Sequence, residues 1–296
     1  MNNSFKIFGV RGSLIGDMIM ALPILNWLEE KYPGSYKYWA IENKCKQAAE
    51  LFKAHPLINE VVVLKEENSF TKDERALIES CDIAFNIRPQ HPDGLPGRKP
   101  MNDWWNRFSC IEETFRMAGL PLSEFQKLSY RKKFPTLPLP GSIGNLGPKA
   151  IGIFPFAAYF KEPKRSPSQK WWEQMVSMLI ESGFEVHHFG WDSEPMLSNQ
   201  AGKDSYTKFT NLPFFEQVKM ALACKTVIGT DSGSSWVMGA YGHPQINLLT
   251  NHAPGHVINL HAFAPQNWTG RVKNLFAFDG CDNISKDSVI KAIEEL

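Results

Sequence analysis

Short apolar runs alternate with helix-like patterns along this chain, and that alternation limits the possible folds more than any other feature of the sequence. In the first half, the patterns predict strands over residues 4–10, 36–42, 60–64 and 82–87. They predict helices over residues 17–32, 44–54, 72–80 and 103–118. Strands that alternate with helices favour a parallel sheet with helices covering both of its faces.

The same alternation restarts after a segment rich in proline and glycine. Residues 130–147, YRKKFPTLPLPGSIGNLG, contain three prolines and three glycines, as is typical of a linker. Beyond it, strands are predicted over residues 149–156, 184–190, 206–209, 226–230 and 245–250. Helices are predicted over residues 166–182, 194–201, 214–223, 234–242 and 286–296.

We therefore expect an α/β protein with two doubly wound, Rossmann-like parallel-sheet domains that face a cleft. The N-terminal domain is expected over residues 1–135, the linker over 136–147 and the C-terminal domain over 148–284. A C-terminal helix over residues 285–296 could pack back on the first domain. Ligands of such sheets bind at the carboxyl ends of the strands, so the loops there are the first candidates for a site.

The overall composition excludes several classes of protein. The chain has 32 basic and 31 acidic side chains, and this balance gives no support for a protein that binds nucleic acid. The five cysteines are widely spaced, as is typical of reduced thiols in the cytoplasm. Neither a signal-peptide core nor a run of about 18 apolar residues is present, so we expect a cytoplasmic protein with at most peripheral membrane association.

The loop between the first predicted strand and the first predicted helix ends in a carboxylate. Its sequence, FGVRGSLIGDMIMALPIL over residues 8–25, contains neither G-x-G-x-x-G nor G-x-x-x-x-G-K-[ST], so it lacks both common nucleotide-binding loops. Asp17 stands where the helix begins, and two interpretations remain open. The carboxylate could simply favour the positive end of the helix dipole, or it could act as a base at the edge of a cleft.

Two loops of the second half place polar residues directly after a strand. In TDSGSSWVMGAYGHP, residues 230–244, Asp231, Ser232 and Gly233 open a helix whose N–H groups could bind a phosphate. An ordinary helix cap is the alternative for this loop. In FGWDSEP, residues 189–195, Glu194 could accept hydrogen bonds from ribose hydroxyls, or it could merely occupy the first turn of a helix.

A third loop of the second half is basic. In FKEPKRSPSQKWW, residues 160–172, Lys164 and Arg165 lie between a strand and a helix, where they could clamp phosphates or form a solvated charge cluster. The histidines give no comparable signal, because His187 and His188 are adjacent on a predicted strand and should point to opposite faces. We expect no metal site, and without G-x-S-x-G we expect no serine hydrolase.

Taken together, these loops resemble the ADP-heptose:lipopolysaccharide heptosyltransferase family, which consists of inverting glycosyltransferases with the GT-B fold. Residues 11–25, RGSLIGDMIMALPIL, are similar to the family's basic-x-S-x-x-G-D motif and the helix after it. Residues 163–172, PKRSPSQKWW, are similar to its K-R-W-P-x-x-x-W motif, with Ser166 in place of the first tryptophan. Residues 229–244, GTDSGSSWVMGAYGHP, are similar to its D-S/T-G-x-x-H signature, with Trp236 in place of the histidine.

The resemblance implies transfer of a sugar, of the heptose type, from a nucleotide-diphosphate sugar to a glycan or lipopolysaccharide-like acceptor. An ADP-sugar is the favoured donor, and neither a cofactor nor a metal is implied. Asp17 would be the catalytic base, and Glu194 would bind the ribose. The donor diphosphate would be bound by Lys164, Arg165, Asp231, Ser232, Gly233, Ser234 and Ser235, and the acceptor loop would comprise Arg11, Gly12, Ser13 and Gly16.

Trp236 leaves several alternatives open. Ser234 or Ser235 could replace the family's histidine, the donor could be held differently, or the activity could be weaker. Two other functions also fit the same loops. One is a nucleotide-sugar epimerase on this scaffold, and the other is a non-catalytic module that binds a glycan or a nucleotide.

Overall fold

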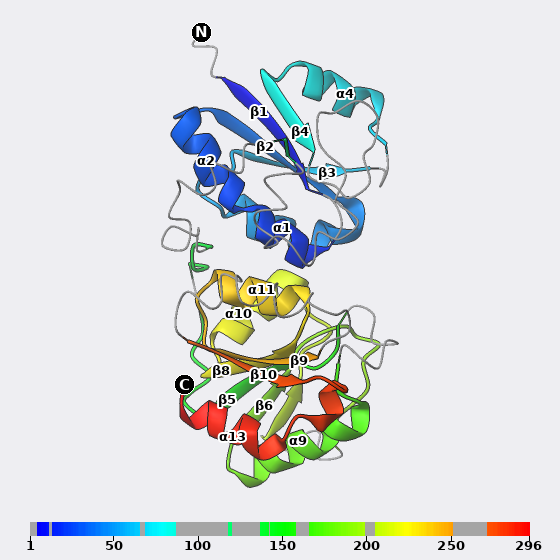
Figure 1. Cartoon of the computed structure of the whole chain (residues 1–296), viewed down its shortest axis with the longest axis vertical. Coiled ribbons are helices and arrows are strands. Elements are labelled where there is room, and N and C mark those ends of the chain that lie inside the picture. Colours follow the sequence, from blue (N-terminus) through cyan, green and yellow to red (C-terminus); the bar gives the residue numbers. More distant parts are fainter. Residues whose placement is uncertain are drawn as a thin grey trace. The chain divides into compact units, whose positions relative to one another are not determined.

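The computed structural model describes residues 5–11, 14–65, 69–86, 118–119, 137–141, 143–157, 166–198, 205–250 and 271–296. The chain divides into two compact units, Met1–Pro138 and Leu139–Leu296, and each contains a parallel sheet (Figure 1). The prediction of two α/β domains with parallel sheets is thus confirmed. We still only predict that the first unit binds the acceptor and that the second unit binds the donor.

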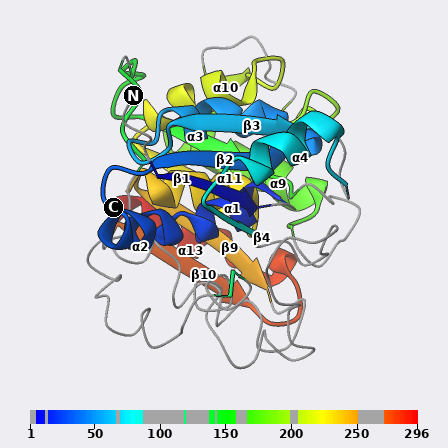
Figure 2. The same ribbon diagram turned by 90° about the horizontal axis from the view of Figure 1, so that it is seen from above.

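The first unit contains parallel strands in the order β3-β2-β1-β4. Its strands are β1 Lys6–Arg11, β2 Tyr36–Glu42, β3 Glu60–Leu64 and β4 Ile83–Asn86. Its helices are α1 Ile15–Ala21, α2 Pro23–Lys31, α3 Ala49–Lys53 and α4 Lys72–Glu79, with the 3-10 helix η1 Asn43–Ala48 before α3. Figure 2 shows β3, β2 and β1 side by side. Leu77 of α4 packs against a buried cluster that contains Phe8 and Leu64 of the sheet, so α4 covers one of its faces.

Gly9 lets two aromatic rings meet over the inner strand β1. In the register of the sheet, Gly9 lies beside Trp39 of β2 and Phe85 of β4. A Cβ atom at this position would lie 2.7 Å from the Phe85 ring and 3.0 Å from the Trp39 ring, which is closer than carbon atoms can approach without repulsion. This glycine of the opening segment therefore serves the packing of the sheet.

The helix predicted over residues 17–32 is divided in two in the structure. α1 ends at Ala21, and α2 begins at Pro23. Proline has no N–H group to donate to a preceding turn, but it is favoured at the first position of a helix, and this explains the break. The helix predicted over residues 103–118 lies outside the described residues, apart from Ala118, which belongs to a turn.

The second unit contains parallel strands in the order β10-β9-β8-β5-β6-β7. Its strands are β5 Ala150–Phe154, β6 Glu185–His188, β7 Tyr206–Lys208, β8 Thr226–Thr230, β9 Gln245–Thr250 and β10 Val272–Ala277. Its helices are α9 Gln169–Glu181, α10 Phe214–Leu222, α11 Gly233–Ala240 and α13 Lys286–Glu294, with the 3-10 helix η3 Cys281–Asn283 before α13. Figure 1 shows α10 and α11 on one face of this sheet and α9 and α13 on the other, which is the expected doubly wound arrangement.

The structure differs from the sequence-based prediction at two elements of this unit. The sequence did not predict β10, whose side chains are only partly buried at the edge of the sheet. The helix predicted over residues 194–201 is wrong over its described part, because residues 194–198 form bends and irregular structure. The N–H of Glu194 donates to the carbonyl of Trp191 in a tight turn, and Pro195 follows directly.

The C-terminal helix α13 packs on β9 and β10 of its own unit. Its buried side chains Val289 and Ile293 belong to the same core as Ile151 of β5 and Trp171 of α9. The sequence suggested packing on the first domain instead. The apolar face of this short helix is filled by the core of the second unit, and packing on the first domain stays a prediction.

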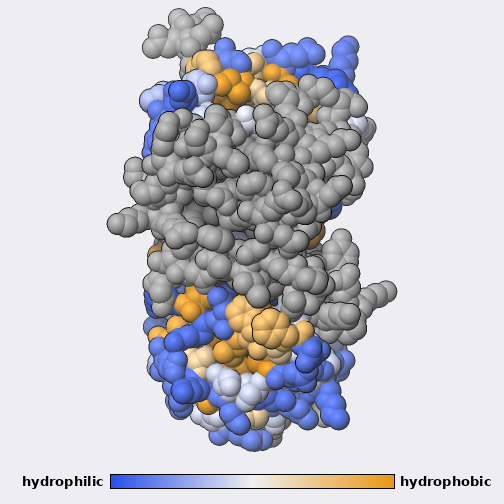
Figure 3. Space-filling model, viewed as in Figure 1, coloured by the Kyte–Doolittle hydropathy of each residue, from blue (hydrophilic) through white to orange (hydrophobic). Residues whose placement is uncertain are grey.

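Within the described ranges, no helix is long and apolar enough to cross a lipid bilayer. The second unit exposes some large apolar side chains, including those of Phe276 and Phe278 at and just beyond the end of β10. Figure 3 shows hydrophobic residues that reach the surface of this unit among hydrophilic ones. Such exposure is common on globular domains.

Candidate functional site

The strand order of the second sheet reverses between β5 and β8. From β5 the chain continues to β6 and β7 on one side, and it then returns to place β8, β9 and β10 on the other. Open α/β sheets bind ligands at the carboxyl edge beside such a reversal. The three sequence motifs of this unit follow β5, β6 and β8, and these three strands are neighbours. The topology therefore brings the three motifs to one edge of the sheet.

The turn after β8 leads directly into the N-terminus of α11. Ser232 precedes the helix in an extended conformation, and its side chain makes no capping hydrogen bond. Instead, its hydroxyl lies 2.7 Å from the hydroxyl of Ser234. The first-turn N–H groups, which begin at Gly233, therefore receive no cap from this serine. A helix N-terminus with two neighbouring hydroxyls suits an anionic group.

Ser235 and Trp236, the next two residues of α11, face the interior. The Ser235 hydroxyl is buried and donates to the carbonyl of Thr230 at 2.6 Å, so it ties the helix to the end of β8. This hydroxyl, which we predicted to contact the diphosphate, thus has a structural partner. Trp236 has an exposed fraction of only 4%. At the position where the heptosyltransferase motif has histidine, this chain therefore has a tryptophan whose ring is packed in the interior.

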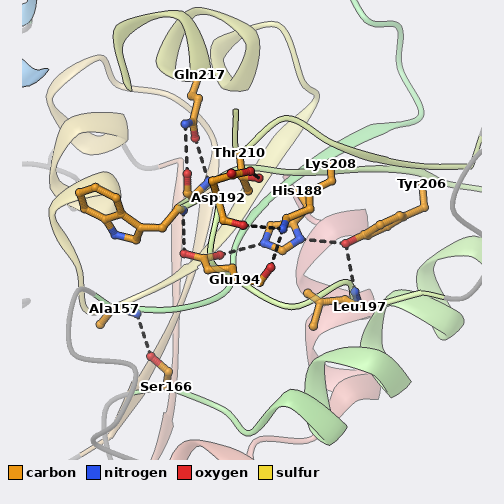
Figure 4. Close-up of polar contacts among 12 residues, drawn as sticks. Ala157, Ser166, His188, Asp192, Glu194, Leu197, Tyr206, Lys208, Thr210 and Gln217 are labelled. Atoms are coloured by element: carbon orange, nitrogen blue, oxygen red, sulfur yellow. Dashed lines mark hydrogen bonds and ion pairs between the residues drawn. The ribbon is translucent and has the colours of Figure 1, made fainter. Parts of the chain in front are cut away.

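The basic segment that contains Lys164 and Arg165 lies outside the described residues, but both of its ends are described. The N–H of Ala157 donates to the hydroxyl of Ser166 at 3.0 Å (Figure 4). Ser166 is buried, so this hydrogen bond fixes the two ends of segment 158–165 to each other beside β5. Its hydroxyl gives Ser166 a structural role at the position where the family motif has tryptophan.

The turn after β6 holds Glu194 with its carboxylate folded back on the backbone. Oε1 of Glu194 accepts a hydrogen bond from the N–H of Trp191 at 2.9 Å, and Oε2 lies 2.9 Å from Nε2 of His188. Gly190 has φ of +147°, and a Cβ there would lie 2.4 Å from Oε1. Only glycine fits at this position. The Glu194 side chain has an exposed fraction of 2%.

Two side chains from other elements hold the backbone of this turn. Gln217 of α10 accepts from the N–H of Gly190 at 2.8 Å and donates to its carbonyl at 3.1 Å. Lys208 of β7 donates to the carbonyl of Asp192 at 3.2 Å and also to the carbonyl of Glu194. The turn is thus fastened to β7 and α10 (Figure 4), and its conformation does not depend on Glu194 alone.

His188 and Tyr206 complete the polar network around Glu194. Nδ1 of His188 lies 2.8 Å from the hydroxyl of Tyr206, and the hydroxyl accepts from the N–H of Leu197 at 3.2 Å. Both side chains are buried, and burial raises the pKa of Tyr206 to about 12. The phenol therefore keeps its proton at neutral pH.

In the first unit, Asp17 lies at the corresponding edge of the sheet. The strand order reverses between β1 and β4, and Asp17 belongs to the first turn of α1, which follows β1. Its Oδ2 accepts from the N–H of Leu14 at 3.0 Å, so the carboxylate caps its own helix. This is the helix-start role that the sequence left open.

The structure brings together only part of the predicted site. The turn of Glu194, the ends of the basic segment and residues 231–235 share one sheet edge. Four predicted residues lie outside the described part: Lys164, Arg165, Gly12 and Ser13. The backbone of Arg11 is described, but its side chain is not. Gly16 is buried in the first turn of α1. Among the described residues, no group of three or more His, Cys, Asp or Glu side chains could hold a metal ion.

Sequence analysis missed three residues that build the turn around Glu194. His188, Tyr206 and Gln217 are polar side chains at buried positions of strands and a helix. A buried polar side chain needs a hydrogen-bond partner, so its presence in an otherwise apolar pattern signals a specific contact. The sequence alone could not name the partner, because the register of β6 and β7 was unknown.

No family model matches the sequence, and no curated protein matches it. Solved structures do match the fold. The structure of E. coli ADP-heptose lps heptosyltransferase II is 16% identical, with 98% of each chain covered and a TM-score of 0.74. A glycosyl transferase family 9 structure from Veillonella parvula DSM 2008 is also 16% identical, covers 100% of this chain and 98% of that chain, and has a TM-score of 0.65.

A third structure, E. coli heptosyltransferase WaaC with ADP, is 14% identical, covers 98% of this chain and 97% of that chain, and has a TM-score of 0.58. At such identities a structural match shows the fold and nothing finer. Over its whole length, this chain has the two-domain GT-B fold of the heptosyltransferases and of glycosyltransferase family 9.

Proposed function

We propose that this protein is an inverting glycosyltransferase that moves a sugar from a nucleotide-diphosphate sugar to a glycan. A heptose-type sugar, an ADP donor and a lipopolysaccharide-like acceptor are the specific forms that we favour. The observation that carries the proposal is the meeting of three loops at the strand reversal of the second unit. The GT-B fold of the chain supports it, as do the solved relatives with ADP and with an ADP-heptose analogue.

The second unit would bind the donor. In our proposal, the N–H groups of the first turn of α11 and the hydroxyls of Ser232 and Ser234 hold the diphosphate. Lys164 and Arg165 add positive charge from the segment whose ends meet at Ser166. Together these groups would stabilise the charge that develops on the departing diphosphate, so the transfer needs no metal ion.

Glu194 would bind the ribose of the same donor. Both of its carboxylate oxygens already accept a hydrogen bond from the protein, but each keeps a second lone pair. Two adjacent acceptors match the two neighbouring hydroxyls of a ribose. Because only 2% of the side chain is exposed, we expect the exposed turn beside it, Trp191–Ser193, to shift when a nucleotide binds.

The first unit would activate the acceptor through Asp17. In our proposal, its carboxylate takes the proton of an acceptor hydroxyl while that oxygen forms a bond to the anomeric carbon of the donor sugar. The bond between the anomeric carbon and the diphosphate oxygen breaks, and the nucleoside diphosphate leaves. A single displacement of this kind inverts the anomeric configuration. Arg11, Gly12, Ser13 and Gly16 would line the approach of the acceptor.

The test is a transfer assay with nucleotide-diphosphate sugars, ADP-heptose first, and a lipopolysaccharide core glycan as acceptor. Asp17→Asn should abolish transfer and leave donor binding intact, because asparagine cannot take up the proton. Asp73→Asn is the matched control, since Asp73 also lies in the first turn of a helix of the same unit. Full turnover by Asp17→Asn would show that the base is assigned wrongly.

The same assay separates the competing functions. A donor that is changed in the absence of any acceptor would identify an epimerase. Nucleotide binding without product, with every acceptor tried, would identify a non-catalytic binding module. An unfolding temperature that ADP, UDP and GDP all leave unchanged would contradict the transferase, the epimerase and a nucleotide-binding module.

A further inference from the structure

We propose that Tyr206 and His188 are positioning residues that hold the carboxylate of Glu194 in the orientation in which it binds a ribose. The inference rests on the proposed function, and it assigns a specificity role to two buried residues outside the family-like motifs. Tyr206 would affect nucleotide binding without touching the nucleotide. Its effect would pass through His188 to Glu194.

The three side chains form an unbroken row in the interior of the second unit. His188 lies between the other two, 2.8 Å from the Tyr206 hydroxyl on one side and 2.9 Å from Oε2 of Glu194 on the other (Figure 4). The exposed fractions of His188 and Tyr206 are 0% and 2%. Water therefore has little access to replace either contact, and hydrogen bonds in such surroundings have well-defined geometry.

Chemistry fixes the direction of the hydrogen bonds in this row. An ionised carboxylate can only accept, so the hydrogen of the contact with Glu194 must be on Nε2 of His188. The N–H of Leu197 donates to the oxygen of Tyr206, which leaves the hydroxyl hydrogen to point at Nδ1 of His188. Tyr206 thus selects the imidazole tautomer that presents a donor to Glu194.

The strand register explains why these residues meet. His188 of β6 is paired with Lys208 of β7, and Val186 is paired with Tyr206. Side chains two residues apart on a strand share a face, so His188, Tyr206 and Lys208 lie on the same side of the sheet. Lys208 holds the backbone of the turn, whereas His188 holds its carboxylate. One face of two short strands therefore fixes both the backbone and the side chain of Glu194.

Removal of the Tyr206 hydroxyl should release the orientation of the His188 ring. With no partner at Nδ1, the ring is held on one side only, and it can turn so that its Nε2–H no longer points at Glu194. Glu194 then loses one of its two protein donors, and its oxygens lose their alignment with the ribose hydroxyls. A nucleotide that has both ribose hydroxyls, such as ADP, should therefore lose more affinity than one that lacks the 2′-hydroxyl.

The experiment measures the affinities of ADP and 2′-deoxy-ADP for the full chain by isothermal titration calorimetry. Tyr206→Phe is compared with Tyr241→Phe, a matched control in the same unit: Tyr241 is also buried, but its hydroxyl has no hydrogen-bond partner among the described residues. Both variants are repeated in a Glu194→Ala background, and their folding is checked by thermal melts. His188→Asn, which removes the donor to Glu194, is the second variant should Tyr206→Phe fold poorly.

We expect Tyr206→Phe to weaken ADP binding about tenfold, which is typical for a hydrogen bond that involves a charged group, and to leave 2′-deoxy-ADP nearly unchanged. The effect should vanish in the Glu194→Ala background, as coupled residues require. Equal losses for both nucleotides, a persistent effect without Glu194, or the same loss in Tyr241→Phe would overturn the inference and leave the proposed function standing. A wild-type chain that binds none of ADP, UDP and GDP would overturn both.

Discussion

The substitution Gly190→Ala tests the packing of the turn that carries Glu194. Alanine at this position meets two separate obstacles. The backbone φ of +147° is strained for any residue with a Cβ, and the new Cβ would lie 2.4 Å from Oε1 and 2.5 Å from Oε2 of Glu194. Those oxygens belong to a buried carboxylate with two protein donors, so they cannot move aside without loss of hydrogen bonds.

The expected cost follows from these two obstacles. Backbone strain of this kind costs about 1–3 kcal/mol. Displacement of the carboxylate loses at least one hydrogen bond to a charged group, which contributes about 1.5–3 kcal/mol. We therefore expect the free energy of unfolding of the second unit to fall by about 4 kcal/mol, which lowers its unfolding temperature by about 10 °C in a unit of this size.

Differential scanning calorimetry measures this change, because the two units can unfold in separate transitions. Gly183→Ala is the matched control. Gly183 has φ of +81° in the same unit, but a Cβ there would meet nothing within 4 Å. It should cost only the backbone strain, about 1 kcal/mol. If both substitutions lower the unfolding temperature equally, the carboxylate of Glu194 does not pack against Gly190 and the description of the turn is refuted.

Three further predictions follow from the described contacts. Asp17→Asn should lose all transfer activity in a product assay but keep its donor affinity in calorimetry, and residual transfer near the wild-type rate would exclude it as the base. Ser235→Ala should lower the free energy of unfolding by about 1 kcal/mol in urea, because its hydrogen bond to Thr230 is lost, yet ADP affinity should stay within about twofold of wild type. A large drop in affinity would mean that this hydroxyl contacts the donor. Burial lowers the pKa of His55 from 6.5 to about 4, so below pH 6.5 the unfolded chain binds a proton that the folded chain does not. The first unit should therefore lose about 1 kcal/mol of stability per pH unit between pH 6.5 and 4, and urea melts of His55→Gln should show a smaller pH dependence; an equal dependence would contradict the assignment.

The sequence predicted several inner strands with the bounds they have in the structure, and it predicted the edge strand β3 equally well. β2, β8 and β9 lie at the residues predicted for them, because a strand with helices on both sides of its sheet is an almost continuous apolar run. The pattern of β10, VKNLFA, mixes polar and apolar residues, since this edge strand is only partly buried. The edge strand β3, EVVVL, was predicted because it is rich in β-branched residues, whereas the mixed pattern of β10 could not be distinguished from a loop.

The candidate site was predictable in its motifs but not in its contacts. The positions of Glu194 and Asp231 after strands follow from local sequence, and the parallel sheet brings such positions to one edge. By contrast, the helix predicted from Glu194 onward fails because the side chain of Glu194 bonds to a neighbouring backbone N–H, which stabilises a turn. The role of Tyr206 depends on strand register, which the sequence of one chain does not contain.

The hydrogen bond between Ala157 and Ser166 joins the two residues that flank the basic segment, residues 158–165. Because its two ends are joined next to β5, the sheet is insulated from changes in the length or composition of residues 158–165. The entropy of closing a loop grows slowly, by about 0.6 kcal/mol for each doubling of its length. Under the proposed function, this segment can therefore be exchanged for one that suits another diphosphate sugar, while the scaffold around Glu194 and α11 stays the same.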